Sequence, residues 1–132
     1  MLSRGLLSGH WSGERAATAG PFRQTAPRFT GENLERNLAL VEALRLAQAR
    51  SATVAHLAIA WVLSRGEDIV PLVGSRRRDQ LAEALGATEL RLTAEDLEAI
   101  ERAVPAGAAA GDRYQAPQMA TLDSERGGAR TR

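Results

Sequence analysis

The sequence IVPLV at residues 69–73 constrains the fold of this chain more than any other stretch. It is apolar and β-branched and lies between the acidic pair Glu67-Asp68 and the Gly74-Ser75 step, so it predicts the one clear strand of the chain. Its internal Pro71 favours an edge or distorted position. Because a single strand leaves its backbone groups unpaired, the pattern predicts an α/β fold in which this chain is part of a larger parallel sheet or barrel. The alternative is that partner strands lie hidden among residues 1–30.

The rest of the chain is predicted to be mostly helical. Apolar residues at spacings of three and four predict a helix over 32–50, and Thr53 is suited to cap a second, largely buried helix over 54–64. A short helix is expected over 76–85, and the T-x-x-D sequence that begins at Thr93 predicts a capped final helix that ends before Pro105. Periodicity is lost after that proline. We therefore expect a main domain over 1–105 and a C-terminal loop and disordered tail over 106–132.

Composition excludes several classes of partner. The chain has 17 basic and 16 acidic residues and a net charge of +1, so no global field favours nucleic acid or an anionic membrane. All the basic residues are arginine, and there is no cysteine. The longest apolar stretch, over 54–63, is too short to span a bilayer, and no signal peptide is evident at the N-terminus. We expect a cytoplasmic protein with no nucleic-acid, membrane or specific protein partner and no metal site.

A local anion site is predicted where the strand gives way to the next helix. Gly74 allows a close turn, Ser75 offers a hydroxyl and a backbone N–H, and the first N–H groups of a helix attract phosphate. Arg76, Arg77 and Arg78 follow, of which only one or two can face the same ligand. We favour Arg76 as the anion contact. The alternative is that the three arginines form a solvated face of an exposed helix.

Three blocks resemble the C-terminal portion of the aldo-keto reductases, NADP-dependent (β/α)₈ barrel enzymes. They are LSRGLLSG at 2–9, TVAHLAIAWVLSRGEDIVPLVGSRRRDQLAEALGA at 53–87 and LTAEDLEAIERAVP at 92–105, and GDRYQAPQM near the tail is a weaker match. The resemblance implies that the chain is the C-terminal fragment of a TIM barrel, with IVPLV as the eighth strand. It also implies that NADP, or NADPH, is the cofactor.

The same resemblance assigns roles to individual residues. The loop after the seventh strand, Leu2, Ser3, Arg4 and Gly5, would lie along the pyrophosphate of the cofactor. Gly74 and Ser75 would open the helix that holds the adenosine 2′-phosphate, with Arg76 as its charged partner. Gln80 and Glu83 would reach the adenosine end. Ala84 stands where the family usually has an asparagine, so one adenine contact is expected to be missing.

The catalytic residues of the family are expected to be absent. The family reduces carbonyls with a tyrosine that donates the proton, assisted by a lysine, an aspartate and a histidine, all in its N-terminal half. This chain has no lysine, and its one tyrosine, Tyr114, matches the C-terminal loop. His10 and His56 are interpreted as loop and cap residues. We therefore predict no catalytic residue here, an inactive chain on its own, and a small carbonyl substrate only for the complete protein.

Two other classes of function compete with that interpretation. One is a helical module that binds anions or assists assembly without catalysis. The other is a nucleic-acid reader with the three arginines on a recognition helix, which is disfavoured because IVPLVG is too apolar for the turn of a helix-turn-helix motif.

Overall fold

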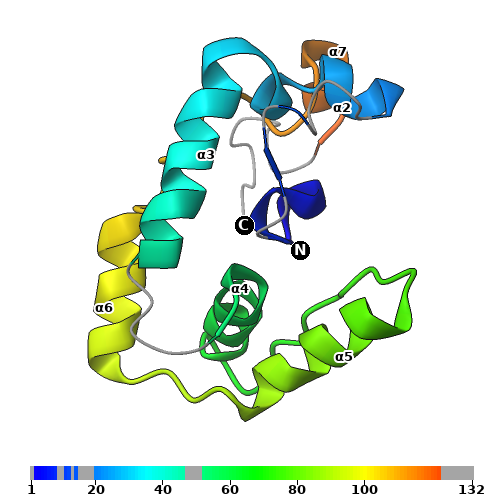
Figure 1. Cartoon of the computed structure of the whole chain (residues 1–132). Coiled ribbons are helices and arrows are strands. Elements are labelled where there is room, and N and C mark those ends of the chain that lie inside the picture. Colours follow the sequence, from blue (N-terminus) through cyan, green and yellow to red (C-terminus); the bar gives the residue numbers. More distant parts are fainter. Residues whose placement is uncertain (1, 9–10, 13, 15–19, 47–51, 123–132) are drawn as a thin grey trace, which may run out of the picture.

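The computed structural model describes residues 2–8, 11–12, 14, 20–46 and 52–122. Their elements run η1 (Ser3–Ser8), α2 (Pro21–Thr25), η2 (Pro27–Phe29), α3 (Gly31–Leu46), α4 (Val54–Leu63), α5 (Arg78–Gly86), η3 (Ala87–Glu89), α6 (Ala94–Ala103) and α7 (Ala116–Met119). In Figure 1, α3 and α6 lie along one side, α4 lies in the middle beside α5, and α2 and α7 lie together at the far end of α3. None of the helices within these ranges is both long and apolar enough to cross a membrane.

The helices that begin at a threonine form as the sequence predicts. Thr53 and Thr93 each accept a hydrogen bond from the backbone N–H three residues on, and the side chain at that position accepts from the threonine N–H in return. This reciprocal pairing satisfies two N–H groups that a helix start otherwise leaves free. The helix predicted over 32–50 is α3, which ends at Leu46, and the predicted residues 47–50 lie outside the described residues.

Two apolar clusters, which share Val41 at their border, hold the elements together. Leu44, Val54, Leu57 and Ile100 form the first cluster, which joins α3, α4 and α6. Leu6, Ala26 and Phe29 form the second, which joins η1 to the segment before α3, with Trp11 edge-on to Phe29 at a centroid distance of 5.1 Å. The helix α4 contacts η1, α3, α5 and η3, so it is the common support of the chain. The nearly all-apolar sequence of α4 is explained by this central position.

The predicted α/β fold with one clear strand is wrong for the described part of the chain, which contains helices and no β-strand. Residues 69–73 have no regular secondary structure, and no strand among the described residues is available to pair with them. Val70 and Leu72 are 78% and 82% exposed, as expected of an apolar strand sequence with nothing covering it. Strand formation depends on a neighbouring strand that local sequence does not supply, and Pro71 removes one of the N–H donors.

The C-terminal segment, residues 110–115, is held closely although it has no regular secondary structure before α7. Asn37, 1% exposed, bonds to both backbone groups of Ala110: its amide donates to the carbonyl at 2.9 Å and its oxygen accepts from the N–H at 2.8 Å. The same amide donates to the Arg28 carbonyl, and Arg28 Nε donates to the Gly111 carbonyl at 3.1 Å. This docked segment lies within the predicted C-terminal loop and disordered tail over 106–132, of which residues 123–132 lie outside the described residues.

Candidate functional site

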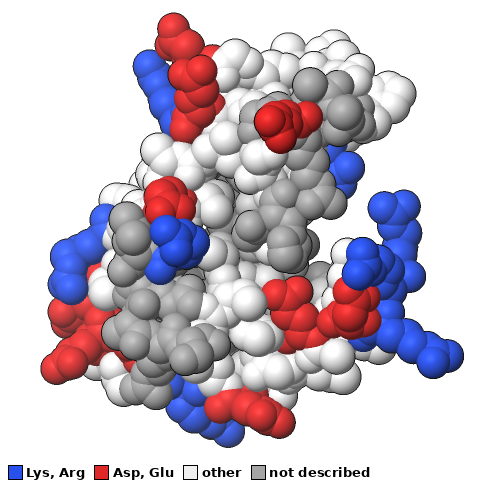
Figure 2. Space-filling model, viewed as in Figure 1, with Lys and Arg blue, Asp and Glu red and all other residues white. Residues whose placement is uncertain are grey.

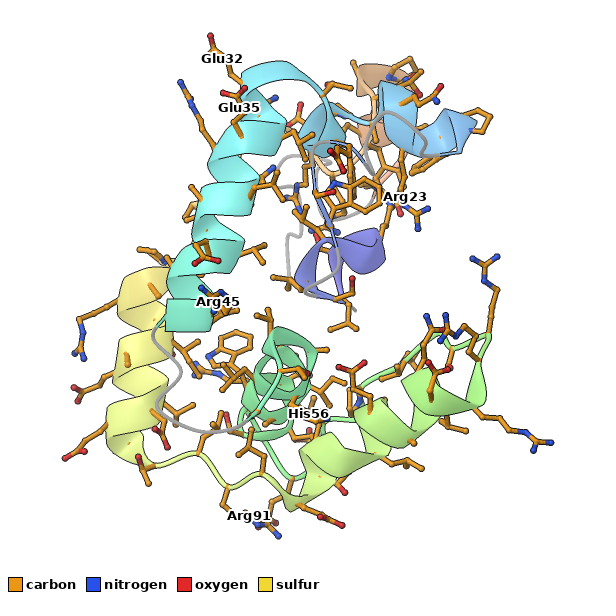
Figure 3. The ribbon with its side chains drawn as sticks, viewed as in Figure 1. Arg23, Glu32, Glu35, Arg45, His56 and Arg91 are labelled. Atoms are coloured by element: carbon orange, nitrogen blue, oxygen red, sulfur yellow. The ribbon has the colours of Figure 1, made fainter. Side chains whose placement is uncertain are left out.

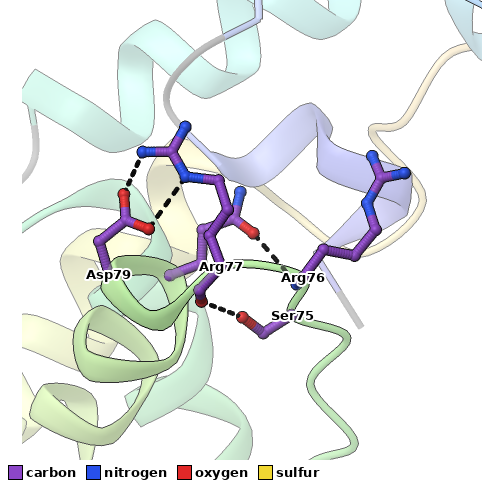
Figure 4. Close-up of polar contacts among 5 residues, drawn as sticks. Ser75, Arg76, Arg77 and Asp79 are labelled. Atoms are coloured by element: carbon purple, nitrogen blue, oxygen red, sulfur yellow. Dashed lines mark hydrogen bonds and ion pairs between the residues drawn. The ribbon is translucent and has the colours of Figure 1, made fainter.

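The arginine turn, residues 74–78, leads from residues 69–73 into α5. The helix begins at Arg78, two residues later than predicted, because Arg77 is extended and occupies the N-cap position. Two short-range hydrogen bonds shape the turn: Ser75 Oγ donates to the Arg77 carbonyl at 2.8 Å, and the Arg76 N–H donates to Gln80 Oε1 at 3.3 Å. Figure 4 shows both bonds. The Ser75 hydroxyl therefore bonds within the turn. Ser75 is half-buried.

The three arginines differ in their surroundings, although all are exposed. Arg77 forms a two-pronged ion pair with Asp79, in the first turn of α5, with Nε 2.9 Å from Oδ1. This pairing holds the pKa of the Asp79 carboxyl below its ordinary value, chiefly through the side-chain hydrogen bond. The guanidinium groups of Arg76 and Arg78 have no ion pair or hydrogen bond to any described residue. In Figure 2, basic side chains project into solvent on the side where α5 begins.

The other predicted site residues near the turn are Gly74, Gln80 and Glu83. A Cβ at Gly74 would meet nothing within 4 Å, so no close approach requires the glycine in this structure. Gln80 is used by the Arg76 N–H, as described above. Glu83 Oε1 accepts a hydrogen bond of 2.8 Å from the Thr53 hydroxyl, which ties α5 to the start of α4. Gln80 and Glu83 therefore support the turn and its helix in this structure.

The second predicted segment, Leu2 to Gly5, has an unusual backbone. Ser3, Arg4 and Gly5 have positive φ values of 48°, 57° and 98° in succession. Only the glycine adopts this region freely, so Ser3 and Arg4 are strained and must be held by their surroundings. The carbonyl of Arg4 accepts two hydrogen bonds from the Arg23 guanidinium, at 3.1 and 3.0 Å, and the Gly5 N–H donates to the Leu2 carbonyl at 2.9 Å.

The side chain of Arg4 points to the C-terminal segment. Its Nη1 donates to the Arg113 carbonyl at 2.6 Å, and its guanidinium carbon lies 4.2 Å from the ring centroid of Tyr114 and 4.8 Å from that of Phe22. Next to these rings is a cavity of about 120 Å³ lined by Phe22, Thr25, Ala26, Tyr114, Gln115 and Gln118. No lining residue is charged, so the cavity offers no counter-charge for a phosphate.

No hydrogen bond or ion pair between described residues joins Leu2–Gly5 to the arginine turn. Both segments are instead supported by α4, which contacts η1 on one side and α5 on the other. The two parts of the predicted site are thus placed by a shared helix. Among the described residues, no group of histidine, aspartate and glutamate side chains could hold a metal ion.

Comparison with known proteins identifies the family. A model of the aldo/keto reductase family matches residues 2–105, most of the chain. The chain belongs to the aldo-keto reductase family. It is 40% identical over 114 residues to "Probable aldo-keto reductase 1" of Glycine max, covering 86% of this chain and 33% of that protein. It is 35% identical over 114 residues to "Aldo-keto reductase yakc [NADP(+)]" of Schizosaccharomyces pombe, covering 86% and 34%.

A third aldo-keto reductase, "Aldo-keto reductase str7" of Strobilurus tenacellus, is 28% identical over 124 residues, covering 93% of this chain and 37% of that protein. The chain therefore spans about a third of the length of the curated relatives it matches. No solved structure matches it.

The histidine of this aldo-keto reductase chain that lies among the described residues has the predicted cap role. His56 Nδ1 accepts from the Thr53 N–H at 3.4 Å, completing the reciprocal cap of α4. Its Nε2 is buried, has no hydrogen-bond partner among the described residues, and lies 3.3 Å from where a Cβ on Gly86 would stand. Figure 3 shows His56 on α4 in the lower half of the view and Arg23 above η1 in the upper half. His10 lies outside the described residues.

Sequence reasoning missed the residues that hold the Leu2–Gly5 loop of this aldo-keto reductase chain, namely Arg23, Phe22 and the C-terminal Tyr114. The hydrogen bond from Arg4 to Arg113 spans 109 positions, and no local pattern encodes such a pairing. For the nearby contacts of Asn37, the sequence did contain an indication. Asn37 is polar and lies among the apolar positions of α3, where a buried amide with defined partners is the usual explanation.

Proposed function

We propose that this chain supplies the NADP(H)-binding segments of an aldo-keto reductase that reduces carbonyl compounds or oxidises alcohols. In this proposal Gly74, Ser75 and Arg76 bind the adenosine 2′-phosphate, and Leu2, Ser3, Arg4 and Gly5 lie along the pyrophosphate. Gln80 and Glu83 lie at the adenosine end. A relative named for NADP(+) supports this choice of cofactor.

The observation that carries the proposal is the difference between neighbouring arginines. Asp79 neutralises Arg77 and leaves Arg76 exposed and without an ion pair among the described residues, beside the first turn of α5. A phosphate there would gain an uncompensated guanidinium and the positive end of a helix dipole. NAD lacks the 2′-phosphate and would gain neither, so the turn predicts preference for NADP.

The test is calorimetric titration of the full chain with NADP⁺, NAD⁺ and adenosine 2′,5′-bisphosphate. We expect NADP⁺ to bind at least about 10-fold more tightly than NAD⁺, because a charge-assisted hydrogen bond contributes about 1.5 to 3 kcal/mol. Arg76→Gln should remove that preference. The matched control is Arg78→Gln, an equally exposed arginine two residues on, which should retain it. Equal affinities for the two cofactors, or equal effects of the two substitutions, would refute the 2′-phosphate assignment.

The proposal also includes the absence of turnover by this chain alone. With no lysine in the sequence and Tyr114 stacked on Arg4, the chain lacks a positioned proton donor of the family's kind. Mixing the chain with NADPH and a small aldehyde should leave the absorbance of the reduced nicotinamide unchanged. Oxidation above the uncatalysed rate would contradict this part. The small carbonyl substrate, the cytoplasmic location and the absence of nucleic-acid or membrane partners belong to the same proposal.

The second candidate is a non-catalytic module that binds anions or assists assembly. The exposed Val70 and Leu72 favour it, because exposed apolar surface often marks an interaction site. Such a module would bind inorganic pyrophosphate as tightly as adenosine 2′,5′-bisphosphate. A clear preference for the nucleotide would exclude general anion binding.

A further inference from the structure

The contacts of Arg4 distinguish it from the other arginines assigned to the cofactor. Its guanidinium already has a carbonyl partner at 2.6 Å and lies over two aromatic rings, whereas that of Arg76 has no such partner among the described residues. A cation stacked on aromatic faces and bonded to a carbonyl would have to break these contacts to reach a phosphate. The Arg4 side chain is therefore poorly placed to be a phosphate ligand.

The backbone of Arg4 is held independently of its side chain. Arg23 of α2 donates twice to the Arg4 carbonyl, and the Arg23 guanidinium lies 5.5 Å from the ring centroid of Trp11. The loop is thus fixed from two directions, by α2 through the carbonyl of Arg4 and by the C-terminal segment through its guanidinium. Two successive non-glycine residues with positive φ each cost about 1 to 2 kcal/mol, so the loop needs such external support.

We infer that Arg4 is a positioning residue that couples the shape of the Leu2–Gly5 loop to the docking of Tyr114. The inference rests on the proposed function, because the loop matters for binding only if it faces the pyrophosphate. Undocking the Tyr114 ring removes one of the two supports of the loop. The loop then samples other conformations, and the cofactor binds only the fraction that keeps the described one.

The C-terminal segment is well suited to transmit this coupling. Asn37 bonds to Ala110, Arg28 to Gly111, and Gln115 Nε2 donates to the Thr25 carbonyl at 3.1 Å. These contacts fix the backbone on both sides of Tyr114. The ring therefore meets Arg4 without a large ordering cost at the moment of binding.

The test uses the full chain with Tyr114→Leu and, as its conservative control, Tyr114→Phe. Leucine removes the aromatic face and phenylalanine keeps it, and Tyr114 makes no hydrogen bond to a described residue through its hydroxyl. We expect Tyr114→Leu to raise the Kd for NADP⁺ by about 3- to 30-fold, from the range of cation–π energies. The Kd for adenosine 2′,5′-bisphosphate, which lacks the pyrophosphate, should change less than about 2-fold. Tyr114→Phe should bind NADP⁺ as tightly as the unsubstituted chain.

A second measurement tests the coupling without any cofactor. The N–H groups of Gly5 and Leu7 donate to the Leu2 carbonyl, at 2.9 and 3.3 Å, and report on the loop by hydrogen exchange. Tyr114→Leu should accelerate their exchange relative to Tyr114→Phe, while the Val104 N–H at the end of α6 exchanges at the same rate in both. Arg4→Lys, which keeps the charge but loses the planar fork, should accelerate the same two groups.

The outcomes separate the two proposals. If the unsubstituted chain binds neither NADP⁺ nor adenosine 2′,5′-bisphosphate, the proposed function fails and the exchange data still decide the coupling. If Gly5 and Leu7 exchange equally in Tyr114→Leu and Tyr114→Phe, the coupling is refuted whatever the chain binds. If both ligands weaken by the same factor in Tyr114→Leu, the effect is general loss of structure and the positioning role is refuted.

Discussion

Two segments without regular secondary structure, residues 110–115 and residues 69–77, are held in opposite ways. The C-terminal segment receives hydrogen bonds from side chains that are distant in the sequence, such as Asn37 on α3 and Arg4 on η1. Within the described part of the chain, every hydrogen bond of residues 69–77 reaches a partner no more than four positions away, as with Ser75 to Arg77.

The difference shows what can replace a β-sheet. Backbone groups in an extended segment need partners, and an amide or guanidinium side chain supplies them as a neighbouring strand would. Residues 110–115 have such side chains around them. Residues 69–73 do not, and their apolar side chains Val70 and Leu72 stay exposed. One segment is therefore expected to contribute strongly to stability and the other weakly.

The largest effect is expected from Asn37→Ala, which removes three hydrogen bonds and leaves the half-buried backbone groups of Ala110 without these partners. Since each lost hydrogen bond costs about 1 kcal/mol, the free energy of unfolding should fall by about 3 kcal/mol. Urea denaturation measures it. Asn33→Ala is the control on the same helix, losing a single bond to the Pro27 carbonyl and about 1 kcal/mol. Equal losses of unfolding free energy in the two variants would show that the Asn37 hydrogen bonds to the C-terminal segment add no more stability than the single bond of Asn33.

A somewhat smaller effect is expected from Gly111→Ala. Gly111 has φ 80°, and a Cβ there would stand 2.8 Å from the Pro27 carbonyl oxygen and 2.8 Å from Asn33 Nδ2. Positive φ and the close contact together should cost about 2 to 3 kcal/mol.

Gly107 provides the matched control for that substitution. It has the same φ of 80°, but a Cβ there would meet nothing within 4 Å. Gly107→Ala should therefore cost only the conformational term, about 1 kcal/mol. Thermal or urea unfolding of both variants measures the difference, and a Gly107→Ala chain as unstable as Gly111→Ala would mean that the close packing of the C-terminal segment adds nothing.

The sequence predicted the parts of the fold that depend on neighbours along the chain. Thr53 and Thr93 signalled their capped helices because each cap is made within three residues. The prediction of a strand over 69–73 was wrong. A strand must pair with another segment, and a run of apolar β-branched residues does not show whether such a segment is present.

The candidate site divides in the same way. The sequence analysis favoured Arg76 among the three consecutive arginines. In the structure, Arg77 is the one of the three that forms an ion pair with a described residue, Asp79. The role of Arg4 depends on Tyr114, which is distant in the sequence, so no spacing rule could have predicted it. The family resemblance identified the Leu2–Gly5 loop, but it could not show which side chains of the loop already contact other residues of the chain.

A small effect is expected from Leu72→Ala in the other segment. The side chain is 82% exposed, so the free energy of unfolding should change by less than about 0.5 kcal/mol. Leu57→Ala, at a buried position of the first cluster, should cost about 2 to 5 kcal/mol. Urea denaturation at two protein concentrations measures both. A cost above about 1.5 kcal/mol for Leu72→Ala would show that this leucine is covered in solution, and a dependence on concentration would identify a second copy as the cover.

The smallest effect concerns the pH dependence of the Arg77–Asp79 pair. Because the pKa of Asp79 in the folded chain lies below its ordinary value, the pair stabilises the fold at pH above that value, about 4, and the contribution is lost as pH falls through the folded pKa. Asp79→Asn should therefore lower the urea midpoint slightly at pH 6 and by less as the pH is lowered below 4. Glu35→Gln, at an exposed carboxylate without an ion pair among the described residues (Figure 3), should show no such difference.

Asp79→Asn should also free Arg77 at pH 7 and so strengthen binding of adenosine 2′,5′-bisphosphate. Unchanged or weaker binding would mean that the paired arginine is held away from the phosphate whether or not its partner is charged.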